Sequence, residues 1–273
     1  MTSDQTLVEH LDLVWASIDD VGRSLTEADW KTPTEVPGWS VQDNLVHVTA
    51  LEWRLLGRPE PAHTLPADLD LVHVRNDFGR ANEVFVDSRR GRRGAEALAE
   101  FEEVTAARSA WLHAATPDDF ASPSWTPMGA GTVRDLLPFR IFDAWVHEQD
   151  MRRAVAHPGD LDGAVARSAM ARVTATLPFV VGKKVAPPDG TTVVVELRAP
   201  LDGRHAVVME GRARALDEVP PNPTVRLRTD GETFARLACG RLDAQGVLAA
   251  GAVTFDGDAA LGTRVVESLN FLF

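Results

Sequence analysis

Two residue types that bind metal ions lie four positions apart in the segment "RIFDAWVHEQD", which covers residues 140–150. In an α-helix, residues four apart lie on one face, so Asp143 and His147 would present a carboxylate oxygen and an imidazole nitrogen to the same point. A divalent ion such as zinc accepts this mixture of donors, and a catalytic site uses three protein ligands and keeps one position open. The competing interpretation is a surface ion pair, which the spacing alone does not exclude.

A third ligand has to come from another helix, and His47 in "NLVHVTALEW" is the strongest candidate because its neighbours are apolar. The two helices also share a start signal. Ser40 with Asp43 and Thr132 with Asp135 each resemble a capping box, with aspartate in place of the usual glutamate. A hydrogen-bonded core histidine is the alternative for His47.

Apolar positions at a spacing of three and four predict a series of amphipathic helices. Proline- and glycine-rich segments separate them, and "TPDDFASPSWTPMGAG" is expected to be a long loop. The helices are expected over residues 5–25, 40–57, 70–90, 94–115, 132–156 and 161–182.

The pattern changes near "GKKVAPPDG". Beyond it, "TTVVVELR", "HAVVMEG" and "TVRLRT" are short runs rich in β-branched residues, which are typical of strands. Further helices are expected in "GETFARLACGR" and "DAALGTRVVESL". The predicted architecture is therefore an all-helical portion over residues 1–185 and a small α+β domain over residues 186–273.

Composition and net charge limit the kinds of partner and the compartment that we expect for this protein. The formal net charge of −12 argues against a nucleic-acid partner. No apolar run is long enough for a membrane span, and "MTSDQTLVEH" does not resemble a secretory signal. The single cysteine, Cys239, fits a reducing compartment. These features predict a cytoplasmic protein with neither a nucleic-acid nor a membrane partner.

Three segments resemble the DinB-like mycothiol-dependent metalloenzyme family, in its maleylpyruvate isomerase-like branch. "VPGWSVQDNLVHVTALEW" is similar to that family's helix with the first metal histidine, and "FRIFDAWVHEQDMRRAV" to its later helix with an acidic residue, a histidine and an aspartate. "ACGRLDAQGVLAAGAVTFDGDAALGTRVVESLNFLF" is similar to the end of its sterol-carrier-like α+β domain. The resemblance implies that the helical portion is a DinB-like four-helix bundle.

The resemblance also implies the site. The family's metal ligands fall on His47, Asp143 and His147, the family's usual glutamate being replaced by the shorter Asp143. The implied cofactors are a divalent metal, with zinc as the first choice, and mycothiol as cosubstrate. Cys239 is expected to be a structural thiol and not a substitute for mycothiol.

Other polar residues are candidates around this site. Arg75 and Arg80 lie where the family offers an arginine to its substrate, and Arg226 or Arg228 could contribute from the smaller domain. Asp150 could hold a ligand histidine in its proper tautomer. Solvated or ion-paired roles are the alternatives for all of them, including an ion pair of Asp150 with a nearby arginine.

The resemblance predicts an enzyme in which a metal-activated thiolate attacks a small electrophile, as a maleylpyruvate-type cis–trans isomerase or a thiol S-transferase. A metal-dependent hydrolase on the same fold is one alternative, and a non-enzymatic metal-binding or regulatory protein is another. The expected partners are a small-molecule electrophile and a thiol, and the chain is expected to be a monomer or a weak homo-oligomer.

Overall fold

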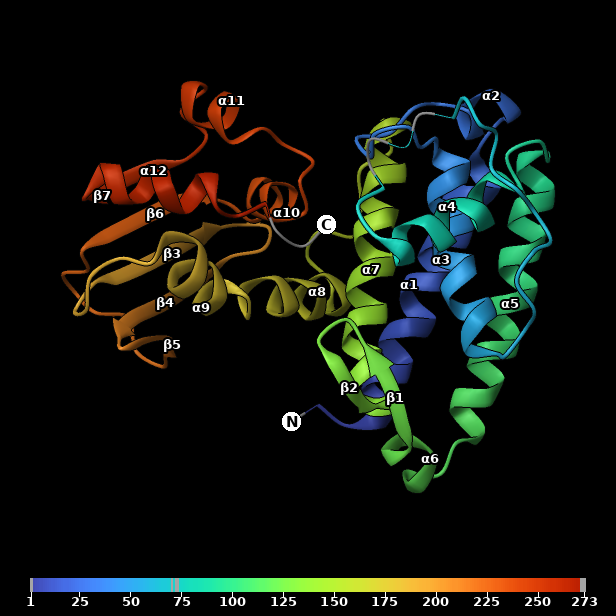
Figure 1. Cartoon of the computed structure of the whole chain (residues 1–273), viewed down its shortest axis with the longest axis horizontal. Helices are drawn as coiled ribbons and strands as arrows, with labels where there is room; N and C mark the ends of the chain where they lie inside the picture. Colours follow the sequence, from blue (N-terminus) through green and yellow to red (C-terminus); the bar gives the residue numbers. More distant parts are fainter. Residues whose placement is uncertain (1, 70, 72–73, 271–273) are drawn as a thin grey trace. The chain divides into compact units, whose positions relative to one another are not determined.

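The computed structural model describes residues 2–69, 71 and 74–270 (Figure 1). The chain divides into two compact units, Met1–Asp160 and Leu161–Phe273. The first unit is mainly helical, and the second combines helices with a sheet, so the predicted fold class is confirmed.

Among its described residues, the first unit contains four long helices, two short ones, one of intermediate length and a β-hairpin, which Figure 1 labels. In chain order they are α1 (Asp4–Ser24), α2 (Glu27–Trp30), α3 (Val41–Leu55), α4 (Asp77–Asp87), α5 (Gly94–Ala114), α6 (Pro117–Ala121), β1 (Pro123–Thr126), β2 (Gly129–Thr132) and α7 (Val133–Ala154).

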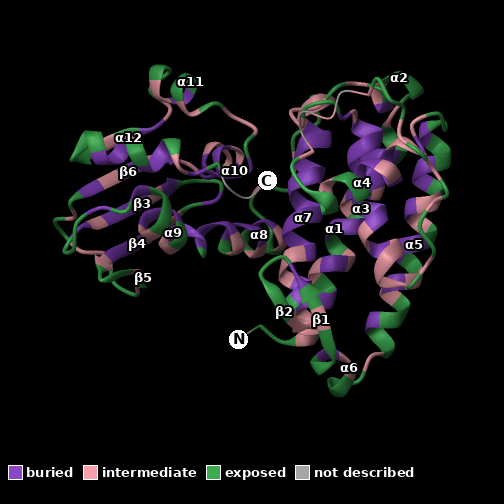
Figure 2. Ribbon diagram, in the orientation of Figure 1, coloured by how far each residue is buried: buried purple, intermediate pink, exposed green. Residues whose placement is uncertain are grey.

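The long helices form the expected four-helix bundle. Helix α1 packs against α5 and α7, and α3 packs against the same two helices. The apolar stripe of α1 is buried as its spacing predicts. Helices α3 and α7 are buried on more than one face, so they form the interior of the bundle (Figure 2).

Both predicted capping boxes are present. The Ser40 side chain accepts from the backbone N–H of Asp43, whose carboxylate accepts from the backbone N–H of Ser40. Thr132 and Asp135 make the same pair at the start of α7. These caps satisfy backbone donors that helix geometry leaves without partners, and they therefore define where the two central helices begin.

Two predictions in this unit need correction. The segment expected to be a loop contains α6 and the hairpin β1–β2, whose strands pair antiparallel from Pro123↔Thr132 to Thr126↔Gly129. Its prolines and glycines are unfavourable inside strands, so the sequence pattern did not indicate these short strands. Helix α4 is shorter than the helix expected over residues 70–90, and residues 70, 72 and 73 lie outside the described residues. Asn76 caps α4 by accepting from the backbone N–H of Gly79.

The second unit contains a five-stranded sheet in the order β5–β4–β3–β6–β7. Strands β3 and β6 are parallel, and the other neighbours are antiparallel. The strands are β3 (Thr192–Arg198), β4 (Gly203–Glu210), β5 (Arg212–Leu216), β6 (Val225–Asp230) and β7 (Thr254–Gly257). The run Val193–Val195 is fully buried, as expected for a central strand covered on both faces.

Several helices of the second unit pack against the strands of this sheet. Helices α10 and α12 pack against β6, and α9 packs against β4 and β5. The remaining segments of the unit are α8 (Ala164–Thr174), α9 (Leu177–Phe179), a π-helical segment η1 (Val180–Val185), α10 (Gly231–Ala238), α11 (Ala244–Ala249) and α12 (Ala259–Glu267).

The division between the units lies earlier than the boundary predicted near residue 186. Helix α8 packs against α10 and therefore belongs to the second unit. The helical periodicity of α8 resembled that of the preceding bundle helices. The change from helical to strand-like sequence near residue 186 therefore did not mark the division between the units. Among the described residues, no helix combines the length and apolarity needed to cross a bilayer.

Candidate metal centre

His47 comes from the middle of α3, where the helix is buried on both sides of it. Its side chain is 6% exposed, and its Nε2 lies 3.4 Å from Oδ1 of Asp143 on α7. A residue 96 positions away in the sequence is therefore brought into direct contact with the predicted pair.

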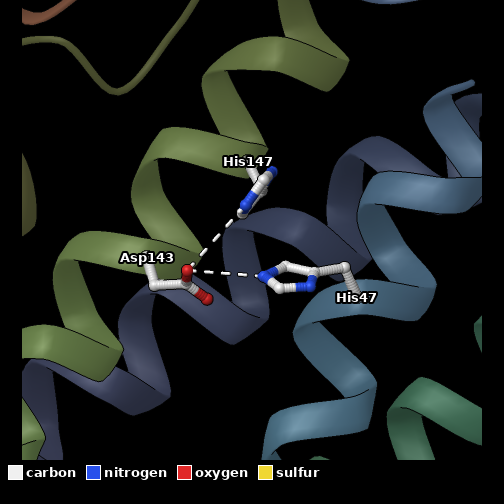
Figure 3. A group of neighbouring side chains, drawn as sticks. All are labelled: His47, Asp143 and His147. Atoms are coloured by element: carbon white, nitrogen blue, oxygen red, sulfur yellow. Dashed lines mark hydrogen bonds and ion pairs between the residues drawn. The ribbon is translucent and has the colours of Figure 1, made fainter. Parts of the chain in front are cut away.

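Asp143 and His147 lie one turn apart on α7, as their spacing predicted. Nε2 of His147 lies 3.8 Å from the same Oδ1 atom. The two imidazole rings meet edge to face, with their centroids 4.5 Å apart. Figure 3 shows that all three side chains point toward one another from α3 and α7.

The three residues together meet the geometric requirement for a metal site. One donor atom from each residue lies within 4.8 Å of the donors of the other two, and all three residues are buried. Two imidazole nitrogens and one carboxylate oxygen are donors that zinc and several other divalent ions accept. The donor set therefore fits a divalent cation, and the surface ion-pair interpretation of Asp143 and His147 does not describe this buried cluster.

The carboxylate of Asp143 is in the form that a metal requires. Burial by itself would raise the pKa of Asp143, but the charges of His47 and Arg140 outweigh burial and hold that pKa well below its usual range. Arg140 also donates from Nη1 to Oδ2 of Asp143, at 2.8 Å. Asp143 is therefore ionised at neutral pH, and proton release does not limit its use as a ligand.

His147 is oriented by Asn44, a residue that the sequence analysis did not single out. Nδ2 of Asn44 donates to the backbone carbonyl of Ser40, at 2.9 Å, and to Oγ1 of Thr34, at 3.0 Å. A carbonyl can only accept, so the amide nitrogen must face Ser40, and Oδ1 faces Nδ1 of His147 at 2.7 Å. Nδ1 must therefore carry a hydrogen, so in the neutral imidazole the lone pair is on Nε2, which faces the cluster.

Among the described residues, no hydrogen bond to Nδ1 orients the ring of His47 as Asn44 orients that of His147. The Nδ1 atom of His47 is buried without a hydrogen-bond partner among the described residues. Its ring packs instead on Trp39, with centroids 5.0 Å apart, and Trp39 also lies 5.8 Å from the ring of His147. Nε1 of Trp39 donates to Glu83, which holds the indole in place. The two imidazoles are thus confined by one shared aromatic neighbour.

Asp150 lies close to the cluster but is not the nearest partner of His147. Its Oδ2 atom is 3.6 Å from Nδ1 of His147, which is longer than a hydrogen bond. Its Oδ1 accepts from Nη2 of Arg153 at 2.6 Å, and Asp150 is fully buried. The ion pair expected as an alternative is present, and the orienting position is occupied by Asn44. A catalytic role for Asp150 stays a prediction.

The predicted substrate-binding arginines lie in different parts of the chain. Arg75 and Arg80 are exposed, just before α4 and in its first turns. Arg226 lies on β6 of the second unit, where its Nη2 donates to the carbonyl oxygens of Pro220 and Pro221. The roles of all three stay predictions.

The chain matches two family models. Residues 11–152 match the mycothiol maleylpyruvate isomerase N-terminal domain, and residues 172–270 match the SCP-2 sterol transfer family. No curated protein sequence gives a significant match.

Two solved structures of a mycothiol-dependent maleylpyruvate isomerase are similar to this chain in fold. One has a TM-score of 0.59, and a mutant form has a TM-score of 0.56. Each is 14% identical in sequence, and each match covers 93% of this chain and 93% of the other. At this identity the likeness establishes a shared fold.

Proposed function

Because the chain belongs to the mycothiol maleylpyruvate isomerase N-terminal domain family, we propose that it is a metal-dependent enzyme that uses mycothiol to attack a small electrophile. The observation that carries this proposal is the convergence of His47, Asp143 and His147 on one point inside the bundle. Three protein ligands are the usual number for a catalytic divalent metal, which keeps a further position for a reactant. The proposed ion is divalent, with zinc as the first choice.

The residues of the chain would prepare this site in two ways. Asn44 holds His147 with its Nε2 lone pair directed inward, and the low pKa of Asp143 keeps that carboxylate ionised. The burial of all three side chains keeps water away from them and strengthens electrostatic attraction. A bound divalent ion would supply the positive charge that favours the thiolate form of mycothiol over the thiol.

Two reactions are compatible with a thiolate in this position. Addition to a cis double bond, rotation and elimination would give the trans isomer and return the thiol, as in a maleylpyruvate-type isomerase. Displacement of a leaving group or opening of an epoxide would give a stable thioether, as in an S-transferase. We propose that Arg75 and Arg80 are candidates for orienting a carboxylate-bearing electrophile, because a guanidinium pairs with both oxygens of a carboxylate.

The ligand assignment is tested by measuring bound metal in the purified chain and in His47→Ala, Asp143→Ala and His147→Ala. Each variant is expected to lose most of its metal. His157→Ala is the matched control, because His157 is exposed in the same unit and should leave the metal content unchanged. Metal retained by both histidine variants of the cluster would refute the assignment.

The thiol requirement is tested separately on the metal-loaded chain. Mycothiol should raise the unfolding temperature of the wild-type chain, because a ligand that binds only the folded state stabilises it. This increase should disappear in His147→Ala. Turnover of a cis-configured electrophile such as maleylpyruvate should require added mycothiol. Turnover without any thiol would favour a metal-dependent hydrolase, and no response to thiol or electrophile would favour a non-enzymatic protein.

A further inference from the structure

A buried ion pair lies directly beside the candidate metal centre. Glu52 on α3 is fully buried, and Arg140 on α7 is 4% exposed. Nε of Arg140 donates to Oε1 of Glu52 at 2.7 Å. A second buried arginine, Arg108 on α5, approaches the other oxygen of Glu52, with Nε 3.4 Å from Oε2. Burying charged groups is costly unless they are paired, so removing one member of this cluster would leave its partner uncompensated.

Arg140 uses a different nitrogen to contact the metal centre. Its Nη1 donates to Oδ2 of Asp143 at 2.8 Å, whereas Oδ1 of Asp143 is the atom that faces both imidazoles, at 3.4 and 3.8 Å. The two oxygens of this carboxylate therefore have separate partners. The planar guanidinium can hold both Glu52 and Asp143 at once, because its donors are fixed in a fork.

We propose that Arg140, anchored by Glu52, is a positioning residue that restricts Asp143 to binding a metal through Oδ1 alone. This inference rests on the proposed metal site. A carboxylate can coordinate an ion through one oxygen or through both, and two-oxygen binding would use the position needed for the thiol. Because Oδ2 is held by a charge-assisted hydrogen bond to Arg140, turning Oδ2 toward the ion would break that contact, and binding through Oδ1 alone is favoured. The position for the thiol is thereby kept open.

The same contacts balance the charge of the site. Two carboxylates, Asp143 and Glu52, are matched by two guanidinium groups, Arg140 and Arg108, so these four side chains have no net charge. A divalent ion bound to Oδ1 and to two neutral imidazoles would then keep its positive charge largely uncompensated. An anionic thiolate is the ligand that such a site favours electrostatically.

The inference is tested with Arg140→Gln and Glu52→Gln, loaded with Co²⁺ in place of the native ion. The visible spectrum of bound Co²⁺ distinguishes a four-coordinate ion from one of higher coordination number. Arg140→Gln should show the spectrum of a higher coordination number and should bind the metal about 10–100-fold more weakly in competition with a chelator. Glu52→Gln keeps the shape of the side chain but removes the negative charge that pairs with Arg140. The Co²⁺ spectrum and the metal affinity should therefore change in the same direction as in Arg140→Gln, by a smaller amount.

A matched control comes from the same helix. Arg152 on α7 is also a buried arginine paired with a glutamate, with Nε 2.7 Å from Oε1 of Glu148. Arg152→Gln should destabilise the chain to unfolding but should leave the Co²⁺ spectrum and the chelator competition unchanged. This separates positioning of the ligand from a general contribution to folding.

The possible outcomes separate the two proposals. If the wild-type chain binds Co²⁺ and the Arg140 and Glu52 variants have its spectrum and affinity, the positioning role is refuted and the metal site stands. If the wild-type chain binds no divalent ion, both proposals fail. If Arg140→Gln does not fold, Glu52→Gln and Arg140→Lys decide the question. Lysine keeps the charge but has all its donors on one nitrogen and lacks the fixed fork that reaches Glu52 and Asp143 together, so Arg140→Lys should also alter the spectrum.

Discussion

Oδ1 of Asn44 on α3 lies 2.7 Å from Nδ1 of His147 on α7, so the orientation of one metal-ligand candidate is set by a neighbouring helix. Asn44 is fully buried and is itself held by the backbone carbonyl of Ser40, the residue that caps α3. The capped start of one helix is therefore connected through two hydrogen bonds to a ligand candidate on another. Partners of this kind orient metal-binding histidines and increase their basicity.

Replacement of Asn44 should weaken metal binding without removing a ligand. Asn44→Ala leaves Nδ1 of His147 without its acceptor, and we expect the affinity for zinc to fall about 10–100-fold in chelator competition. Asn44→Asp retains an oxygen acceptor for Nδ1 but loses the donor to Ser40. It should lower the unfolding temperature while keeping most of the metal affinity. Equal metal affinity in Asn44→Ala and the wild-type chain would show that Asn44 does not support the ligand.

The shorter carboxylate of Asp143 is expected to be matched to this site. In Asp143→Glu the added methylene moves the carboxylate toward His47, whose Nε2 is already 3.4 Å from Oδ1, and away from its present contact with Arg140. We expect weaker zinc binding by about tenfold or more, since a ligand and its supporting partner are displaced together. Titration of the metal-free variant and of the metal-free wild-type chain with zinc measures this change in affinity. Unchanged affinity would mean that the site adapts to either acid.

A close contact at the start of α5 should make a larger side chain unfavourable at Gly94. A Cβ atom at Gly94 would lie 1.9 Å from Cδ1 of Trp30, a buried side chain. Gly94→Ala should therefore destabilise the chain by about 1–3 kcal/mol, although alanine is the better helix former. Urea denaturation measures the change. Gly91→Ala is the control, because a Cβ there meets no atom within 4 Å. A similar effect in both variants would contradict the steric explanation.

The second unit should lose stability in mild acid. Burial lowers the pKa of His205 on β4 from its ordinary value of 6.5. Below about pH 6.5 the unfolded chain therefore binds a proton that the folded chain resists, and stability falls as pH decreases. Urea denaturation of the full chain between pH 5 and 8 should show this decline, with a smaller slope for His205→Gln. Because His205 is only partly buried, the decline is expected to be modest. Identical slopes would assign it to other groups.

Local sequence determined the features that depend on neighbours within one helix. The spacing of Asp143 and His147 specified a shared helical face, and the pairs Ser40–Asp43 and Thr132–Asp135 specified where α3 and α7 begin. These relationships need only helix geometry and short-range hydrogen bonds, so they can be read from the chain. Strands β3, β4 and β6 of the second unit were also predictable, because buried β-branched runs are distinctive.

Tertiary structure decided which distant residues meet. His47 could be proposed from its apolar helix and from the family resemblance, but its 3.4 Å approach to Asp143 depends on how α3 packs on α7. The partners Asn44 and Glu52 carry no local signal, because their roles arise only across that interface. The hairpin β1–β2 and the assignment of α8 to the second unit were missed for the same reason. Pairing and packing between segments are not encoded in the periodicity of either segment alone.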